Sequence, residues 1–101
     1  MRYMGEGIEI VCKKGALQWM ITEKPYALIN DSETRHLTWG EPVSVPLVPN
    51  TPHKIMVAFP YLGKKACMPA TIQVTVRAGE VQRYRYKTAS TVFSPGKIEH
   101  I

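Results

Sequence analysis

The sequence predicts an all-β protein, an antiparallel β-sandwich of about seven or eight short strands. Apolar and polar residues alternate with a period of two in several segments, which is typical of half-buried strands. Turn residues recur roughly every eight to twelve positions, as in sandwiches. No helical periodicity extends over about ten residues. A small β-barrel is the alternative, because it uses short strands of the same pattern.

The chain of 101 residues has the length of one domain. We expect a single domain over residues 1–101, with frayed ends at 1–6 and 95–101. No apolar run reaches the roughly 20 residues of a membrane span, and the N-terminus lacks the apolar region of a signal peptide, so a cytoplasmic location is predicted. Cys12 and Cys67 are expected to be reduced and buried, with a single disulfide between them as the alternative.

Strands are predicted along the N-terminal half of the chain. Pro25 prevents a helix, because the residue before a proline is pushed to extended geometry. Asn30, Asp31 and Ser32 predict a turn, since their side chains hydrogen-bond nearby backbone groups. Pro46 cannot donate to a strand ladder, so its strand is an edge strand or is bulged. The predicted strands here are residues 7–13, 16–22, 26–29, 33–39 and 43–47.

The clearest two-strand signal lies in residues 70–87, after a strand at 53–61 and a connection at 61–69. Three β-branched residues alternate with polar residues before Gly79, and two tyrosines alternate with basic residues after it. A three-residue turn ending at this glycine would keep both apolar sets on one face, so a hairpin is predicted. A last short strand is expected at 91–94. The apolar face of the hairpin would consist of Ile72, Val74, Val76, Tyr84 and Tyr86.

The C-terminal part of the chain carries the whole net charge of +5. The opposite face of the predicted hairpin is basic, and such a face permits an anionic partner. It also suits a solvated surface that prevents aggregation of strand edges. The alternation directs Tyr84 and Tyr86 away from the basic face, which counts against stacking of nucleic acid bases there. The candidate binding residues are Arg77, Arg83, Arg85 and Lys87, with Lys64 and Lys65 expected nearby.

A series of turn-type motifs runs through residues 26–94. The motifs are Leu28-Ile29-Asn30-Asp31, Trp39-Gly40, Val43-Ser44-Val45-Pro46, the segment from Pro49 to Val57, and Ala78-Gly79-Glu80. Their order resembles that of the small bacterial PEGA-like β-sandwich domains. The resemblance implies a β-sandwich that serves as an appended interaction module, and it implies no catalytic residues.

Enzymatic chemistry finds little support in the residue pattern. Cys12 or Cys67 could be combined with His36 or His53 as nucleophile and base, but no local signature marks either cysteine. Metal-ligand spacings and a Gly-rich phosphate loop are absent, so no metal and no cofactor are expected. Aromatic residues at alternating strand positions are expected in the core, and a ligand cleft is the alternative; they are Trp19, Trp39 and Tyr61.

The sequence therefore favours a non-catalytic interaction module. We expect it to bind a protein partner, or its own copy, through an exposed strand edge or the basic face. A binder of nucleic acid or another anionic ligand through Arg83, Arg85 and Lys87 is the alternative. His53 is expected to begin a strand and to satisfy backbone groups of a turn, and His100 is expected to lie in the tail.

Overall fold

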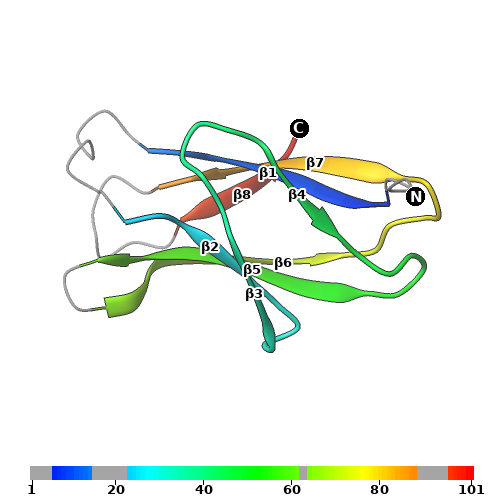
Figure 1. Ribbon diagram of the computed structural model, residues 1–101, viewed down its shortest axis with the longest axis horizontal. Helices are drawn as coiled ribbons and strands as arrows, with labels where there is room; N and C mark the ends of the chain where they lie inside the picture. Colours follow the sequence, from blue (N-terminus) through cyan, green and yellow to red (C-terminus); the bar gives the residue numbers. More distant parts are fainter. Residues whose placement is uncertain (1–5, 15–22, 62–63, 89–95) are drawn as a thin grey trace.

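The structure, a computed structural model, describes residues 6–14, 23–61, 64–88 and 96–101. Its strands form two four-stranded sheets that lie face to face (Figure 1). Sheet A contains, in spatial order, β4 (Val43–Pro46), β1 (Gly7–Lys13), β7 (Val81–Lys87) and β8 (Lys97–His100). Sheet B contains β3 (Glu33–His36), β2 (Tyr26–Ile29), β5 (His53–Tyr61) and β6 (Lys64–Val74). The predicted β-sandwich is confirmed, and the described strands form no closed barrel.

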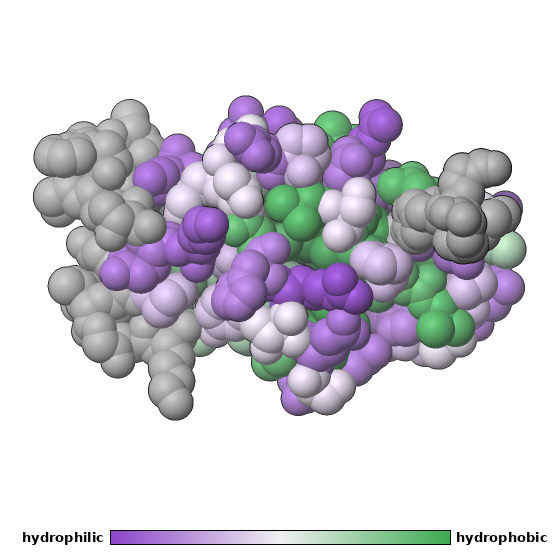
Figure 2. All heavy atoms as spheres, in the orientation of Figure 1, coloured by the Kyte–Doolittle hydropathy of each residue, from purple (hydrophilic) through white to green (hydrophobic). Residues whose placement is uncertain are grey.

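The hydrophobic core lies between the two sheets. In β1 the alternate residues Ile8, Ile10 and Cys12 are buried, and the two isoleucines belong to the same apolar cluster as Ile55 and Val57 of β5. Figure 2 shows patches of hydrophobic residues on this side of the molecule, the largest near its middle, with hydrophilic residues around and between them. Strand pairing is antiparallel throughout the described ladders except between β1 and β7, which are parallel.

The predicted hairpin in residues 70–87 is wrong. Both of its strands exist, but β6 pairs with β5 in sheet B, whereas β7 lies between β1 and β8 in sheet A. The chain crosses between the sheets through a turn in which the Glu80 N–H donates to the Arg77 carbonyl (2.9 Å). Val74 and Tyr86 point into the core from opposite sheets. Alternation determines which face of a strand is buried but not which strand is its neighbour, so it could not distinguish the two arrangements.

Several element boundaries also differ from the prediction. Most of the connection predicted at 61–69 is strand, because β6 already begins at Lys64. The tail predicted at 95–101 contains β8, which pairs with β7 and includes His100. β3 ends at His36, earlier than the strand predicted at 33–39. The strands predicted at 16–22 and 91–94 lie outside the described residues.

A turn and an edge strand occur where they were predicted. Asn30 and Asp31 have φ angles of 53° and 59° in the turn between β2 and β3. The Ser32 N–H closes this turn by donating to the Ile29 carbonyl (3.1 Å). β4, which contains Pro46, lies at the edge of sheet A, where a missing backbone donor is tolerated.

Gly7 allows β1 and β4 to approach closely. Its φ is +144°, and an added Cβ would collide with the Val45 carbonyl and lie 2.9 Å from Pro46 Cα. We expect Gly7→Ala to lower the free energy of unfolding by about 3 kcal/mol, from strain and collision together. Gly40→Ala is the matched control, because Gly40 has a φ of +82° but no atom within 4 Å, and it should cost about 1 kcal/mol. Urea unfolding measures both, and equal effects would contradict the close approach.

Candidate functional site

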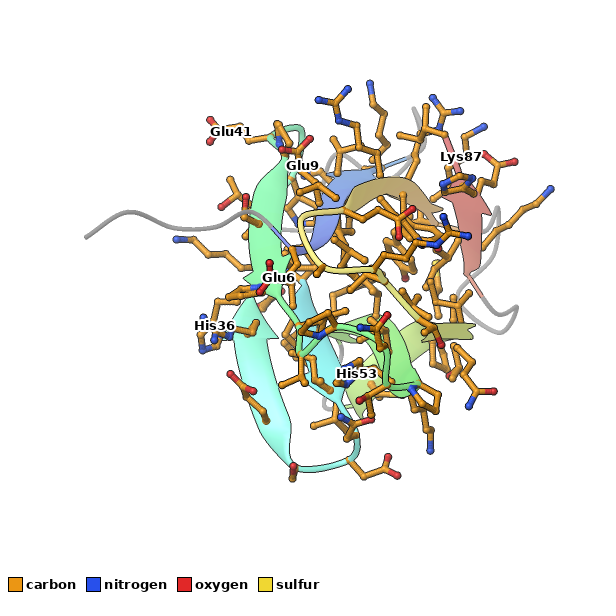
Figure 3. All side chains as sticks on the ribbon, turned by 90° about the vertical axis from the view of Figure 1, so that its right-hand side faces the viewer. Glu6, Glu9, His36, Glu41, His53 and Lys87 are labelled. Atoms are coloured by element: carbon orange, nitrogen blue, oxygen red, sulfur yellow. The ribbon has the colours of Figure 1, made fainter. Side chains whose placement is uncertain are left out.

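The outer face of sheet A carries the basic residues of β7. Arg83, Arg85 and Lys87 point away from the core, because Tyr84 and Tyr86 between them pack into it. Figure 3 shows Lys87 on the outer side of this sheet, together with Glu9 of β1. The outward direction predicted for these three residues is therefore confirmed.

Strand pairing brings charged residues of β1 and β8 beside β7. β1 runs parallel to β7 and β8 antiparallel, so each outward residue of β7 has defined neighbours on the same face. Lys13 and Lys97 were not among the candidate residues, because alternation along the sequence does not identify the neighbours of β7. The charged residues of this face are Lys13, Arg83, Arg85, Lys87, Lys97, Glu9 and Glu99.

Glu99 is the carboxylate that most of these cations approach. It lies 3.6 Å from Arg85 Nε, 3.7 Å from Lys87 Nζ and 3.4 Å from Lys97 Nζ. Attraction to these cations, first of all to Lys87, lowers the pKa of Glu99 below its ordinary value. A carboxylate whose pKa is lowered on folding stabilises the protein at neutral pH, and this contribution is lost as the pH falls through its folded-state pKa. Arg83 makes its own ion pair with Glu9 (3.4 Å).

The other three candidate residues lie elsewhere. Arg77 is exposed in the turn that crosses between the sheets, where its backbone N–H donates to Glu80 Oε1 (2.8 Å). The prediction that Arg77 shares the basic face of a hairpin with the residues of β7 is therefore wrong. Lys64 and Lys65 begin β6 and so belong to sheet B. The six candidates thus do not share one strand face.

No aromatic ring lies among the described outward residues of β1, β7 and β8. Tyr86 is fully buried, and Tyr84 is partly buried against the core with its ring centroid 5.0 Å from that of His100. Trp39 packs edge-on against Phe59, with ring centroids 5.5 Å apart, in agreement with the predicted core position. The side chains of Trp19 and Tyr61 lie outside the described residues. The described part of this face therefore offers charge without a surface for base stacking.

Cys12 and His53 are held in structural positions. Cys12 is a free and fully buried thiol, and burial raises its pKa to about 12. His53 begins β5, as predicted, and its Nε2–H donates to the Val48 carbonyl (2.9 Å) while Nδ1 accepts from Asn30 Nδ2 (3.0 Å). A protonated thiol and an imidazole with both nitrogens engaged do not supply a nucleophile and base.

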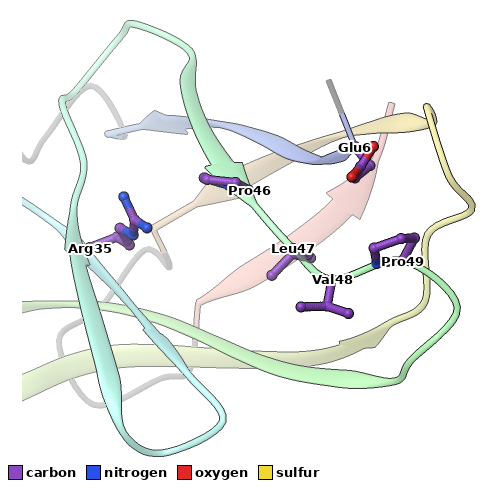
Figure 4. Close-up of a pocket in the computed structure, with 6 residues that line it drawn as sticks. All are labelled: Glu6, Arg35, Pro46, Leu47, Val48 and Pro49. Carbon is purple, nitrogen blue, oxygen red and sulfur yellow. The ribbon is translucent and has the colours of Figure 1, made fainter. Parts of the chain in front are cut away.

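A shallow pocket of about 330 Å³ opens between the two sheets near β3 and β4 (Figure 4). Its charged groups already have partners within the protein. Arg35 Nε donates to Glu33 Oε2 (2.7 Å), and Glu6 Oε1 accepts from the Gly79 N–H (3.2 Å). Both of its charged side chains are therefore held in part by other residues of the protein. It is lined by Glu6, Arg35, Pro46, Leu47, Val48 and Pro49.

Comparison with known protein families, curated proteins and solved structures finds no match. The resemblance to PEGA-like domains thus rests on its motifs and stays a prediction. Within the described ranges, no three or more His, Cys, Asp or Glu side chains are placed to hold a metal ion. The same ranges contain no helix long and apolar enough to cross a membrane.

The burial of Cys12 predicts slow alkylation. In a Cys67→Ser variant, Cys12 is the sole thiol of the chain. We expect iodoacetamide at about pH 8 to modify it at least about 100-fold more slowly in the native protein than in urea, because its pKa is raised from 9.0 to about 12. Mass spectrometry measures the rate. A native rate within about tenfold of the unfolded rate would identify an accessible, reactive thiol instead.

Proposed function

We propose that this protein is a non-catalytic interaction module that binds a protein partner, or a second copy of itself, through the free edge of β6. β6 has 11 residues and lies at the edge of sheet B, where β5 is its only partner among the strands that the structure describes. An edge strand presents unpaired N–H and C=O groups on its outer side, and an extended segment of another chain can pair with them. The PEGA-like motifs support the same function, because they imply an interaction module.

The other edge strands of the described sheets carry features that oppose strand addition. β3 has four residues and includes Glu33 and Arg35. β8 also has four and includes Lys97 and Glu99. β4 is equally short and ends at Pro46, which lacks a backbone donor. Short length, charge and proline are the usual means by which proteins protect sheet edges.

Residues 70–74 of β6 lack this protection, and this observation carries the proposal. The irregular features of the strand come earlier, with Met68 at a φ of 50° followed by Pro69. From residue 70 to 74 the register with β5 is regular and every residue is uncharged. Thr71 and Gln73 expose their side chains in this segment. These five residues therefore form a regular ladder edge that an added strand could extend.

A second candidate function is binding of nucleic acid or another anionic ligand on the outer face of sheet A. It is favoured by the charge of this face, which carries three lysines and two arginines but only two glutamates among its described residues. The inward position of Tyr84 and Tyr86 weighs against single-stranded nucleic acid. An anionic ligand that needs no stacking fits this face better.

Selection of extended peptides from a displayed library, followed by hydrogen exchange on the complex, tests the β6 edge. We expect the amides of residues 70–74 to gain protection. The double variant Thr71→Lys/Gln73→Lys should bind at least about tenfold more weakly, because lysines on an edge oppose strand addition. Thr75→Lys is the matched control, since Thr75 is also exposed but lies beyond the end of β6.

Two results would contradict this assignment. One is protection confined to the strands of sheet A, and the other is equal affinity of the double variant and the control. Sedimentation of the protein alone, at about 10 to 500 µM, measures pairing with a second copy. If the parent protein forms dimers through β6, the double variant should remain monomeric over the same range.

A further inference from the structure

We propose that the outer face of sheet A binds an oligophosphate anion at a row of three lysines. Lys87 of β7 lies directly opposite Lys13 of β1 and directly opposite Lys97 of β8. Residues directly opposite one another project on the same side of a sheet, with the strands about 4.8 Å apart. All three side chains are exposed. This site lies in the sheet opposite to β6 and is independent of the edge proposed above.

The lysine row is electrostatically unfavourable in the unliganded protein. Like charges directly opposite each other destabilise a sheet. Lys87 and Lys97 each approach Glu99, but this carboxylate also meets Arg85. Lys13 makes no ion pair within the described part of the chain. One carboxylate thus compensates several cations, and a bound anion would relieve the remaining repulsion.

The shape of the row selects a compact anion of high charge density. Three strands at this spacing place the lysines along a line of about 10 Å, one residue wide. A chain of phosphoryl groups concentrates several charges over that length, and its end group carries up to about two. An extended acidic peptide presents one carboxylate per roughly 6.6 Å on one face. Nucleic acid supplies a single charge per phosphate and would gain no stacking here.

The residue type agrees with this ligand. An ammonium group is a compact charge with three rotatable donors, so several lysines can adjust to the oxygens of neighbouring phosphoryl groups. Arginine, by contrast, recognises one planar anion through a fixed fork. The adjacent row toward the middle of the sheet contains Val11, Arg85 and Glu99. The negative charge of Glu99 would repel an anion there, so the site is limited to the lysine row.

Binding of inorganic triphosphate, measured by titration calorimetry and thermal unfolding at constant ionic strength, tests the site. We expect saturating triphosphate to raise the Tm by about 4 °C or more. The variant Lys13→Gln/Lys87→Gln/Lys97→Gln should bind at least about tenfold more weakly. Without ligand, its Tm should equal or exceed that of the parent, because the repulsion is removed. Glu99→Gln should bind about threefold more tightly or better, since a competing carboxylate is gone.

A control variant separates the site from the net charge. Lys24→Gln/Lys54→Gln/Arg77→Gln removes three exposed cations outside this face and should retain the parent affinity. Equal binding by the two triple variants, or no binding by the parent, would overturn the proposal. Tighter binding of a short oligothymidylate or of a Glu-rich peptide than of triphosphate would also overturn it. The β6 variant Thr71→Lys/Gln73→Lys should bind triphosphate with the affinity of the parent. A failure of the lysine-row proposal can therefore be told apart from a failure of the β6-edge proposal.

Discussion

The hydrogen bond from the Tyr86 hydroxyl to the Met68 carbonyl, 2.6 Å long, joins the two sheets through the core. Tyr86 is fully buried, so its hydroxyl needs an internal partner. The left-handed backbone at Met68 interrupts the regular ladder of β6. Gly96 donates to the same carbonyl (3.1 Å), and an added Cβ there would lie 2.6 Å from it. Three features therefore depend on one another. They are the irregularity in β6, the position of β7 in sheet A and the start of β8.

Both proposed surfaces depend on this arrangement. Because Tyr86 faces inward, its neighbours Arg85 and Lys87 must face outward. Because the irregularity of β6 lies at Met68, the strand beyond it pairs regularly with β5. The inward position of Tyr84 and Tyr86 thus leaves the charged side chains of β7 outside, and the regular ladder of β6 begins just beyond Met68, which the Tyr86 hydroxyl contacts.

Local patterns in the sequence predicted the fold class and the outward residues of β7, because alternation directly determines which side chains can be buried. The same patterns could not identify strand neighbours, which depend on packing across the whole molecule. The hairpin prediction failed for this reason, and Lys13 and Lys97 were missed as neighbours of Lys87. β8 was missed because its four residues include a lysine, a glutamate and a histidine, so it resembles a tail. Its strand geometry comes from pairing with β7.

Among the described rows of charged residues on the outer face of sheet A, one row lacks a residue of opposite charge. Arg83 faces Glu9 at one level, and Arg85 faces Glu99 at the next, so opposite charges are matched across neighbouring strands. At the third level, lysines occupy all three strands. A face that served solubility alone would gain stability from a glutamate at the central position, Lys87. A single row of like charges on a surface whose other charges are matched is typical of a binding site, because a bound ligand supplies the missing opposite charge.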